Sequence, residues 1–537
     1  MAKQQFDALI IGAGLGGIHS LYHLRAIGLS KLKLIDLASD VGGTWHFNTY
    51  PGAMSDTESY LYRFPWDKED LMTYPWPNHY VTQPEILAYL RHVVLKHDLR
   101  RYMQFNTEMR SATFDEAKNV WLVEVSTGET FEARYLVTAL GLLSRPNLPD
   151  IPGTDTFRGS IVHSHDWDAY AEYRNKRVAI IGTGSTGTQI VTAVAPHAAS
   201  LTVFQRTPQY SVPAGNKPVT TEYRERINQN YDDIWAETRE SSTAFGFQES
   251  TVPCMSVSPE DREKVFEKLW QQGNGFRFMF GGFGDITTNV EANEEACRFV
   301  RKKIAEIVKD PVKARKLTPT NRYARRPLCD SGYYEQFNRE NVDVVDLRGT
   351  EIVALTPKGI RTSDDVEHEV DLIVFATGFD AIDGSYTRLL IRGRNGRTMK
   401  DHWVGGAHSY MSVCCSHFPN MFMINGPQGP FCNIPSAVEA SGELMLGVIK
   451  RAEEARKAND NGGSVAIEVK EEAEDEWGFK CEEVSEGSLF KETNSWIFGA
   501  NIPGKSVASR LWFGGLKSYR EQVAKSFKDN LSDFRII

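Results

Sequence analysis

Gly12-Ala13-Gly14-Leu15-Gly16-Gly17 is the stretch that decides how the first part of the chain folds. A short apolar run, Phe6 to Ile11, precedes it and predicts a β-strand, and a helical pattern follows as far as Ile27. Strand, glycine turn and helix in this order are typical of a Rossmann-like dinucleotide-binding fold. Gly12 permits the tight turn, Gly14 lets a pyrophosphate approach the backbone, and Gly17 allows close packing of the helix. We therefore expect the N-terminus of this helix to bind phosphate groups.

The residue at the end of the next strand predicts which dinucleotide binds. Lys31 to Ile35 reads as the second strand, and Asp36 follows it, nineteen residues after Gly17. A carboxylate at this place accepts a hydrogen bond from a ribose 2′-hydroxyl, which favours FAD or NAD. A loop rich in glycine and aromatic residues, 42–56, comes next, and loops beside nucleotide sites often carry functional residues.

A second glycine loop, Gly182-Thr183-Gly184-Ser185-Thr186-Gly187, follows a predicted strand at Lys176 to Ile181. Nineteen residues after Gly187 the chain has Arg206, where the first site has a carboxylate. Arginine can bind a 2′-phosphate that a carboxylate would repel, so this site is predicted to take NADP(H) and the first site FAD. The alternative is that Arg206 is an ordinary solvated residue at a strand end.

The rest of the chain predicts an α/β protein with two Rossmann-like domains. The segment from Thr220 to Pro327 is helical and highly charged, with a helix start at Ser258-Pro259-Glu260-Asp261. Three prolines between Gly141 and Gly153 indicate a linker. We predict an FAD-binding domain at 1–140 and 386–537, an NADP-binding domain at 152–219 and 331–380, a helical insertion at 220–330, and linkers at 141–151 and 381–385.

Composition limits the partners. Lys and Arg number 61 and Asp and Glu 70, and this net charge of -9 argues against nucleic-acid binding. No apolar run reaches the length of a membrane span, and the chain enters its first strand with no room for a signal peptide. The seven cysteines have no metal-binding spacing, so we expect reduced thiols, no metal and a cytoplasmic location. We also expect a monomer.

The stretch between the two loops, Phe157 to Asp168, carries a family resemblance. It resembles the Baeyer–Villiger monooxygenase fingerprint, F-x-G-x-x-x-H-x-x-x-W followed by P or D, and the rest of the chain matches that family from end to end. The matching positions are Phe157, Gly159, His163, Trp167 and Asp168. Within the family the segments 139–144, 326–334 and 496–505 most resemble the cyclohexanone monooxygenases.

The resemblance implies a flavoprotein monooxygenase (class B) that converts a ketone, O₂ and NADPH into an ester or lactone. In this family a flavin C4a-peroxide attacks the ketone carbonyl, and a carbon then migrates to oxygen. By similarity Arg326 is the catalytic arginine and Asp56 its carboxylate partner, which suits an anionic intermediate in a dry site. His163 is expected to be structural or to lie at a hinge between the domains.

The resemblance also assigns binding residues. For FAD they are Gly12, Gly14, Gly17, Asp36, Thr44, Trp45, Asp56, Tyr62 and Met109. For NADP they are Gly182, Thr183, Gly184, Ser185, Thr186, Gly187, Gln189, Arg206, Thr207, Arg325 and Trp496. An apolar pocket for a small-molecule substrate, a cyclic or fused-ring ketone, is expected from Leu142, Leu143, Phe245, Phe278, Phe431 and Ile434. Gln428 and Cys432 depart from the family's usual Asn and Thr in the pocket loop.

Three other interpretations stay open. A flavin monooxygenase that oxygenates sulfur or nitrogen would share the glycine loops, although its fingerprint lacks the final Trp-Asp or Trp-Pro. A disulfide reductase would need a redox cysteine pair near the flavin, and the vicinal Cys414-Cys415 lies far along the chain. A nucleotide-sensing protein would keep the folds without the chemistry, but the presence of both Asp56 and Arg326 argues against this interpretation.

Overall fold

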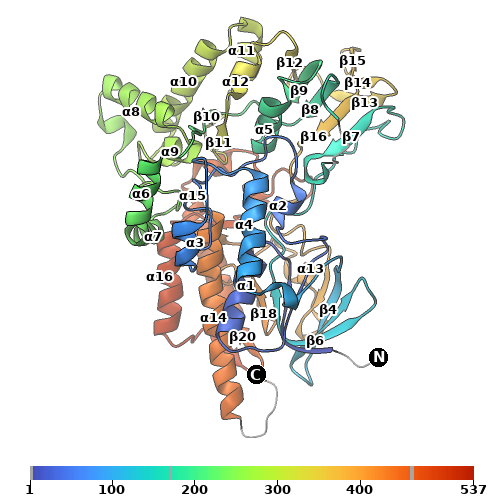
Figure 1. The fold of residues 1–537 in the computed structure, drawn as a ribbon, viewed down its shortest axis with the longest axis vertical. Helices are drawn as coiled ribbons and strands as arrows, with labels where there is room; N and C mark the ends of the chain where they lie inside the picture. Colours follow the sequence, from blue (N-terminus) through green and yellow to red (C-terminus); the bar gives the residue numbers. More distant parts are fainter. Residues whose placement is uncertain (1–3, 168–171, 460–464) are drawn as a thin grey trace.

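Two larger β-sheets organise the computed structural model, which describes residues 4–167, 172–459 and 465–537 (Figure 1). Each sheet contains parallel strands followed by a glycine turn and a helix, so the α/β prediction with two Rossmann-like units is confirmed. Asp168, the last residue of the fingerprint, lies outside the described residues.

The first sheet contains the first glycine turn. Its strand order is β17 (Leu390–Arg392), β4 (Met109–Asp115), β5 (Val120–Val125), β6 (Thr130–Thr138), β1 (Gln4–Ile11), β2 (Leu32–Ile35) and β3 (Met103–Gln104), and β18 (Met421–Met423) also pairs with β6. β1 pairs in parallel with both β6 and β2. Helix α1 (Leu15–Ala26) follows the turn and packs against α14 (Ile434–Ala458), the long helix at the lower end of the molecule in Figure 1.

The second sheet is wholly parallel. Its order is β12 (Val342–Asp346), β9 (Ser200–Gln205), β8 (Arg177–Ile181), β16 (Leu372–Phe375) and β7 (Ser160–His163). Helix α5 (Ser185–Val194) follows the second glycine turn. A separate antiparallel sheet of β13 (Ile352–Thr356), β14 (Gly359–Thr362) and β15 (Glu367–Glu369) lies between β12 and β16 in the chain.

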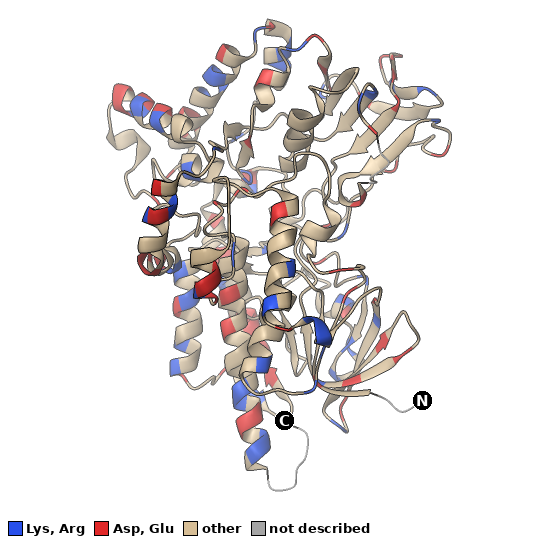
Figure 2. Cartoon of the chain, viewed as in Figure 1, with Lys and Arg blue, Asp and Glu red and all other residues tan. Residues whose placement is uncertain are grey.

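The segment of the chain between β9 and β12 of the second sheet is mainly helical, as predicted. It contains α6 (Thr221–Gln229), α7 (Tyr231–Glu240), α8 (Pro259–Gln272), α9 (Gly275–Phe280), α10 (Val290–Ile307) and α11 (Pro311–Leu317). The Ser258 hydroxyl accepts the backbone N–H of Asp261 and so caps α8. Figure 2 shows Lys, Arg, Asp and Glu interspersed on these helices, which agrees with their charged sequence and leaves one apolar face of each helix for the core.

The remaining elements complete the layers around the two sheets. They are α2 (Thr44–Phe47), α3 (Lys68–Thr73), α4 (Gln83–Lys96), α12 (Tyr333–Gln336), α13 (Met399–His402), α15 (Glu471–Glu486), α16 (Gly515–Lys528), β10 (Ser211–Pro213), β11 (Leu328–Asp330), β19 (Gly429–Pro430), β20 (Ile467–Val469), β21 (Leu511–Trp512) and β22 (Phe534–Ile536). The segment 42–56, expected as a loop, therefore contains one short helical turn, α2. Among the described helices, none combines the length and the apolar character that a membrane crossing requires.

Candidate active site

The first glycine turn has no room for side chains. Gly12 has φ 106°, and a Cβ there would lie 2.4 Å from the Ala139 carbonyl oxygen. A Cβ on Gly17 would lie only 1.8 Å from the Gly12 carbonyl oxygen, so α1 rests directly on the turn. Gly43 of the following loop covers Gly14, because a Cβ on Gly14 would meet the Gly43 Cα at 3.4 Å. The turn is thus closed by backbone from the segment 42–56.

Asp36 braces this turn. One carboxylate oxygen accepts the Ala13 N–H at 2.6 Å and the other accepts the Ala38 N–H at 2.7 Å. Burial raises the pKa of the Asp36 carboxyl, against these hydrogen bonds, which favour the ionised form. The contact of Asp36 with a ribose stays a prediction, and the support it gives to the turn was not predicted.

The second glycine turn repeats the geometry but is open. Gly182 has φ 120°, and a Cβ on Gly187 would lie 2.4 Å from the Gly182 carbonyl oxygen. No described atom outside its immediate neighbours lies within 4 Å of a Cβ built on Gly184. The Thr183 hydroxyl donates to the Thr207 carbonyl at 2.7 Å, which ties the turn to the residue after Arg206.

Arg206 and Arg325 lie near each other beside this turn, and neither forms an ion pair with an acidic residue in the part of the chain that the structure describes. Arg206 is exposed, and the buried Nε of Arg325 has no hydrogen-bond partner among the described residues. Burial and the nearby charge of Arg206 lower the pKa of Arg325. This pair of cations fits a doubly charged phosphate, because it would relieve their repulsion and satisfy the Nε–H group.

Arg326 and Asp56 are brought together between the two turns, although they are 270 residues apart in the sequence. Arg326 Nη2 lies 2.6 Å from Asp56 Oδ2, and Nη1 donates to the Ser185 hydroxyl at the start of α5 at 2.7 Å. Burial opposes the charge of Arg326, but the Asp56 carboxylate outweighs it and the pKa of Arg326 is raised. This geometry holds a permanently protonated guanidinium near the first residues of a nucleotide-binding helix.

Asn274 holds the Asp56 backbone and was not identified from the sequence. Its side chain is buried, donates to the Asp56 carbonyl at 3.0 Å, and caps α9 by accepting the N–H groups of Phe276 and Arg277. Its φ of 76° is unusual for a residue other than glycine. Asn274 therefore fixes the end of the 42–56 segment to the helical insertion.

The same segment contacts α5 of the second sheet. The Tyr50 hydroxyl donates to Gln189 Oε1 at 2.9 Å, and Gln189 Nε2 donates to the Met54 carbonyl at 3.2 Å. Gly52 has φ 86°, and a Cβ there would lie 2.6 Å from the Gln189 carbonyl oxygen. Gln189, predicted to bind NADP, thus joins the two nucleotide units.

Aromatic side chains form one wall beside Arg326. Its guanidinium carbon lies 5.4 Å from the centre of the Phe276 ring, which stacks on Phe245 at 3.8 Å. Phe431 lies next, with its ring 6.3 Å from Phe276. Phe278, which the resemblance assigns to the substrate pocket, is buried against Phe266, Phe299 and Tyr323 within the insertion. Successive side chains on α9 diverge, so Phe276 takes the place expected of Phe278.

The structure places the other predicted pocket and cofactor residues on several elements. Leu142, Leu143 and Trp496 are partly buried against the hydrophobic core that joins the second sheet to the helical insertion. Ile434, at the start of α14, is partly buried against the core beside the first sheet. Trp45 donates its indole N–H to the Tyr62 hydroxyl at 3.1 Å, beside Thr44 in α2. Met109 is buried in the core of the first sheet. Thr186 lies in the first turn of α5.

The fingerprint stretch includes β7, the edge strand of the second sheet, and its end contacts the segment 42–56. The Thr49 hydroxyl donates to the Trp167 carbonyl at 3.3 Å, and the ring of Phe47 stacks on His165 at 4.8 Å. His163 ends β7 beside β16, and its Nδ1 accepts the His165 N–H at 3.1 Å. Burial and the neighbouring His165 lower the pKa of His163 to about 4, so its ring is neutral near pH 7. Phe157 packs in the second sheet's core and Gly159 abuts the Asp371 carbonyl.

Two dinucleotide turns around one arginine–carboxylate pair define a two-cofactor oxidoreductase. Residues 9–258 match the family model described as pyridine nucleotide-disulphide oxidoreductase. Cyclohexanone 1,2-monooxygenase of Acinetobacter sp. is 49% identical over 96% of this chain and 94% of its own length. Phenazine N-monooxygenase of Lysobacter antibioticus is 48% identical over 97% of this chain and 95% of its own. The structure of cyclohexanone monooxygenase from Rhodococcus sp. Phi1 bound to NADP⁺ superposes with a TM-score of 0.96 at 49% identity, covering 100% of this chain and 99% of that one.

The chain belongs to the Baeyer–Villiger monooxygenase family, in its cyclohexanone monooxygenase group. It is an NADPH-dependent flavin monooxygenase with FAD and NADP(H) as cofactors and O₂ as co-substrate. This family assignment replaces the disulfide-reductase alternative, and the vicinal pair Cys414-Cys415 is buried in the protein core.

Proposed function

We propose that the protein inserts one oxygen atom from O₂ into a cyclic ketone, next to the carbonyl carbon, and releases a lactone. The observation that carries this proposal is the Arg326–Asp56 pair, held at 2.6 Å between the two nucleotide turns. Oxygen insertion into a ketone passes through a species with negative charge on oxygen, and a fixed cation in a dry site stabilises such charge.

Different residues would bind the two cofactors, contact the substrate and orient Arg326. The turn at Gly12 to Gly17 would hold FAD, and Arg206, Thr207 and Arg325 would hold the 2′-phosphate of NADPH. When bound, FAD takes electrons from NADPH and supplies the activated oxygen. Arg326 keeps its proton because Asp56 raises its pKa, so it donates hydrogen bonds to the substrate oxygen without becoming an acid. Asp56 and Ser185 fix the direction of the guanidinium.

The apolar wall selects the substrate. Phe245, Phe276 and Phe431 present ring faces and edges beside Arg326, and Leu142 and Leu143 lie among the partly buried residues of the same core. A small ring with one carbonyl group satisfies such a site, since the carbonyl meets the guanidinium and the methylene groups meet the phenylalanines. This supports cyclic ketones over charged substrates.

We further propose the division of the chain predicted from sequence. The entry of β17 and β18 into the first sheet supports assigning 386–537 together with 1–140 to the FAD-binding domain. The pairing of β12 and β16 with β9 and β8 supports joining 331–380 to 152–219.

The test combines a ketone panel with Arg326→Ala. Cyclohexanone and larger cyclic ketones should raise NADPH consumption by the wild type and give lactones identified by mass spectrometry. In Arg326→Ala, lactone formation should fall by about 100-fold or more, while anaerobic reduction of FAD by NADPH keeps a similar rate. Arg326→Lys is the matched control that keeps the charge and loses the forked geometry, and it should be intermediate. Unchanged lactone yield in Arg326→Ala contradicts the proposal.

Oxygenation of nitrogen is the second candidate. It is favoured by one observation, the 48% identity to a protein named phenazine N-monooxygenase. Competition between cyclohexanone and an aromatic N-heterocycle, with both products quantified, separates the two. A higher kcat/KM for N-oxide formation than for lactone formation assigns this function instead.

A further inference from the structure

His402, Cys415 and Glu474 form a buried cluster outside the active site, and the half-buried His408 lies beside it. We propose that these four side chains form a binding site for one divalent transition-metal ion of the zinc class, with a structural role. The sequence predicted no metal, because these donors follow none of the short cysteine and histidine spacings.

The donor atoms converge. One ligand atom each from His402, Cys415 and Glu474 lies within 4.8 Å of the others, and all three residues are buried. His402 Nε2 is 2.9 Å and His408 Nε2 is 3.6 Å from the same atom, Glu474 Oε1. Imidazole nitrogen, thiolate sulfur and carboxylate oxygen are the ligands that zinc takes in tetrahedral sites.

The charge of Glu474 is not balanced by a permanent cation. Its side chain is 1% exposed, and its ion-pair partners within the described residues are only His402 and His408. The Ser416 N–H donates to Oε2 at 2.7 Å, which leaves Oε1 facing the two imidazoles. A buried carboxylate is costly unless a positive charge compensates it, and a divalent ion would do so.

The hydrogen bond of His408 points to the same conclusion. Its Nδ1 lies 2.9 Å from the Gly406 carbonyl, which can only accept, so Nδ1 carries the proton. Nε2 then directs a lone pair towards Glu474 Oε1, and two acceptors facing each other repel unless a cation or a further proton lies between them. Metal-binding histidines commonly donate their other N–H group to a backbone carbonyl in this way.

Cys415 supplies the sulfur donor. Its buried Sγ lies within 4.8 Å of the ligand atoms of His402 and Glu474, and the thiol donates a hydrogen bond to the His408 carbonyl at 3.6 Å. A divalent ion would displace the thiol proton to solvent and neutralise both the thiolate and the carboxylate.

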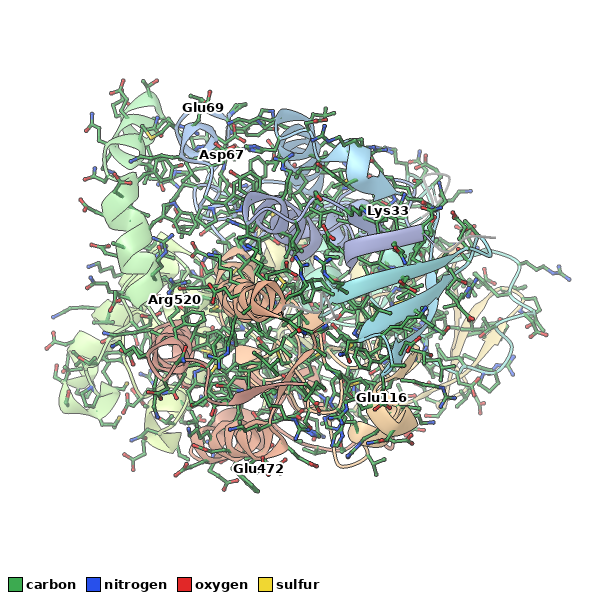
Figure 3. All side chains as sticks on the ribbon, turned by 90° about the horizontal axis from the view of Figure 1, so that it is seen from below. Lys33, Asp67, Glu69, Glu116, Glu472 and Arg520 are labelled. Carbon is green, nitrogen blue, oxygen red and sulfur yellow. The ribbon has the colours of Figure 1, made fainter. Side chains whose placement is uncertain are left out.

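The location suggests what the metal supports. His402 ends α13, Glu474 lies in the first turn of α15, and His408 and Cys415 lie in the segment between α13 and β18. Glu472, labelled in Figure 3, is exposed on α15, whereas Glu474 faces the cluster. The same two segments hold the pocket loop, because Ser409 N–H donates to Gln428 Oε1 at 3.1 Å and Trp477 donates to the Gln428 carbonyl at 3.3 Å. The ion would fix these supports of the pocket loop.

Metal content of the FAD-loaded protein tests the proposal. Because three of the four donors are buried, cells should be grown with added Zn²⁺ or Co²⁺, so that the ion is present during folding. Mass spectrometry of the purified enzyme should then find one metal ion per chain. The cobalt enzyme should show tetrahedral bands at longer wavelengths than the flavin, and its melting temperature should exceed that of enzyme grown with chelator.

Two neighbouring cysteines give a matched comparison. Cys415→Ser should lose about tenfold or more of the bound metal, whereas Cys414→Ser, at an equally buried thiol in the adjoining core, should retain it. His408→Gln should also lose metal. The proposal is overturned if the wild-type enzyme grown with Zn²⁺ holds well under one equivalent, or if both cysteine variants hold the same amount. The cluster is then a hydrogen-bonded network around Glu474 that holds no metal.

Discussion

The two glycine turns share the same backbone geometry but differ in the residues that surround them. In both, the first glycine has a positive φ and the last lies against the carbonyl of the first, at 1.8 Å for a Cβ on Gly17 and 2.4 Å for one on Gly187. The middle glycine differs, since Gly14 meets Gly43 whereas Gly184 meets no described atom within 4 Å. The strand-end residues also differ: Asp36 is buried against the turn and Arg206 is exposed.

The difference matches the two cofactors. A turn covered by backbone and braced by a buried carboxylate suits a group that stays bound, as FAD does in a flavoprotein. An open turn, beside two arginines that pair with no acidic residue among those described, suits NADP(H), which must enter and leave as it is oxidised. On the proposed assignment of the cofactors, the same fold would hold a resident group in one turn and an exchanging group in the other, and the surrounding residues would make the difference.

The largest expected effect comes from adding one methyl group to each turn. Gly17→Ala should yield protein without FAD, because its Cβ overlaps the Gly12 carbonyl and α1 would have to move. Gly187→Ala should keep FAD but lose reduction by NADPH. The ratio of flavin to protein absorbance and anaerobic stopped-flow reduction measure the two effects.

Gly349→Ala, in the loop after β12 and outside both turns, is the control, and it should keep both FAD and the reduction rate, because a Cβ there meets open space. Full FAD occupancy in Gly17→Ala would show that the covered turn does not hold the flavin.

The next largest effect is expected at Arg206, the charged residue after β9, and is measured as KM for NADPH. Arg206→Ala should raise KM for NADPH by about 10–100-fold, the loss of one charge-assisted hydrogen bond to phosphate, and leave KM for NADH nearly unchanged. Steady-state kinetics with both cofactors measures it. Arg348→Ala, at an arginine paired with Asp346 after β12, is the matched control and should change neither constant. Equal changes for NADPH and NADH would remove Arg206 from the phosphate site.

A smaller effect is expected at Asn274, which holds the backbone of Asp56, the ion-pair partner of Arg326. Asn274→Gly should lower the free energy of unfolding by about 1 kcal/mol through lost hydrogen bonds, and Asn274→Ala by about 2–3 kcal/mol, since alanine at positive φ adds strain. In both, oxygenation should slow several-fold while flavin reduction is unchanged, because Asp56 loses its anchor. Thermal unfolding and single-turnover rates measure these changes. Equal loss of both rates would point to a general structural role.

The smallest effect is expected in the pH dependence of stability and comes from His163, at the end of β7. His163 has a pKa of about 4 in the folded protein, below the usual 6.5, so the unfolded chain binds more protons between these values. Its contribution to stability is therefore complete above pH 6.5 and is lost as pH falls towards 4. From pH 8 to pH 6 the loss is less than about 1 kcal/mol. Denaturant titrations of wild type and His163→Gln should differ by this amount in their pH dependence, and parallel curves would exclude a buried neutral His163.

Local patterns in the sequence predicted the parts of the fold that depend on neighbours in the chain. The glycine spacing predicted both turns, and Ser258-Pro259 predicted the start of α8. Two features of the site were beyond such patterns. The contact of Asn274 with Asp56 spans 218 residues, and the choice between Phe276 and Phe278 depends on which side of a six-residue helix faces the pocket. The periodicity of a segment this short does not distinguish the two faces.

The contact between Gly52 and the Gln189 carbonyl has a consequence for building hybrids of this enzyme. Because backbone meets backbone there, no side-chain exchange can repair a mismatch between halves taken from different relatives. A hybrid joined between residues 56 and 185 would contain the segment 42–56 from one parent enzyme and α5 from the other. Chimeras that swap residues 49–56 and 185–193 together should assemble, and those that swap one alone should be the ones that fail.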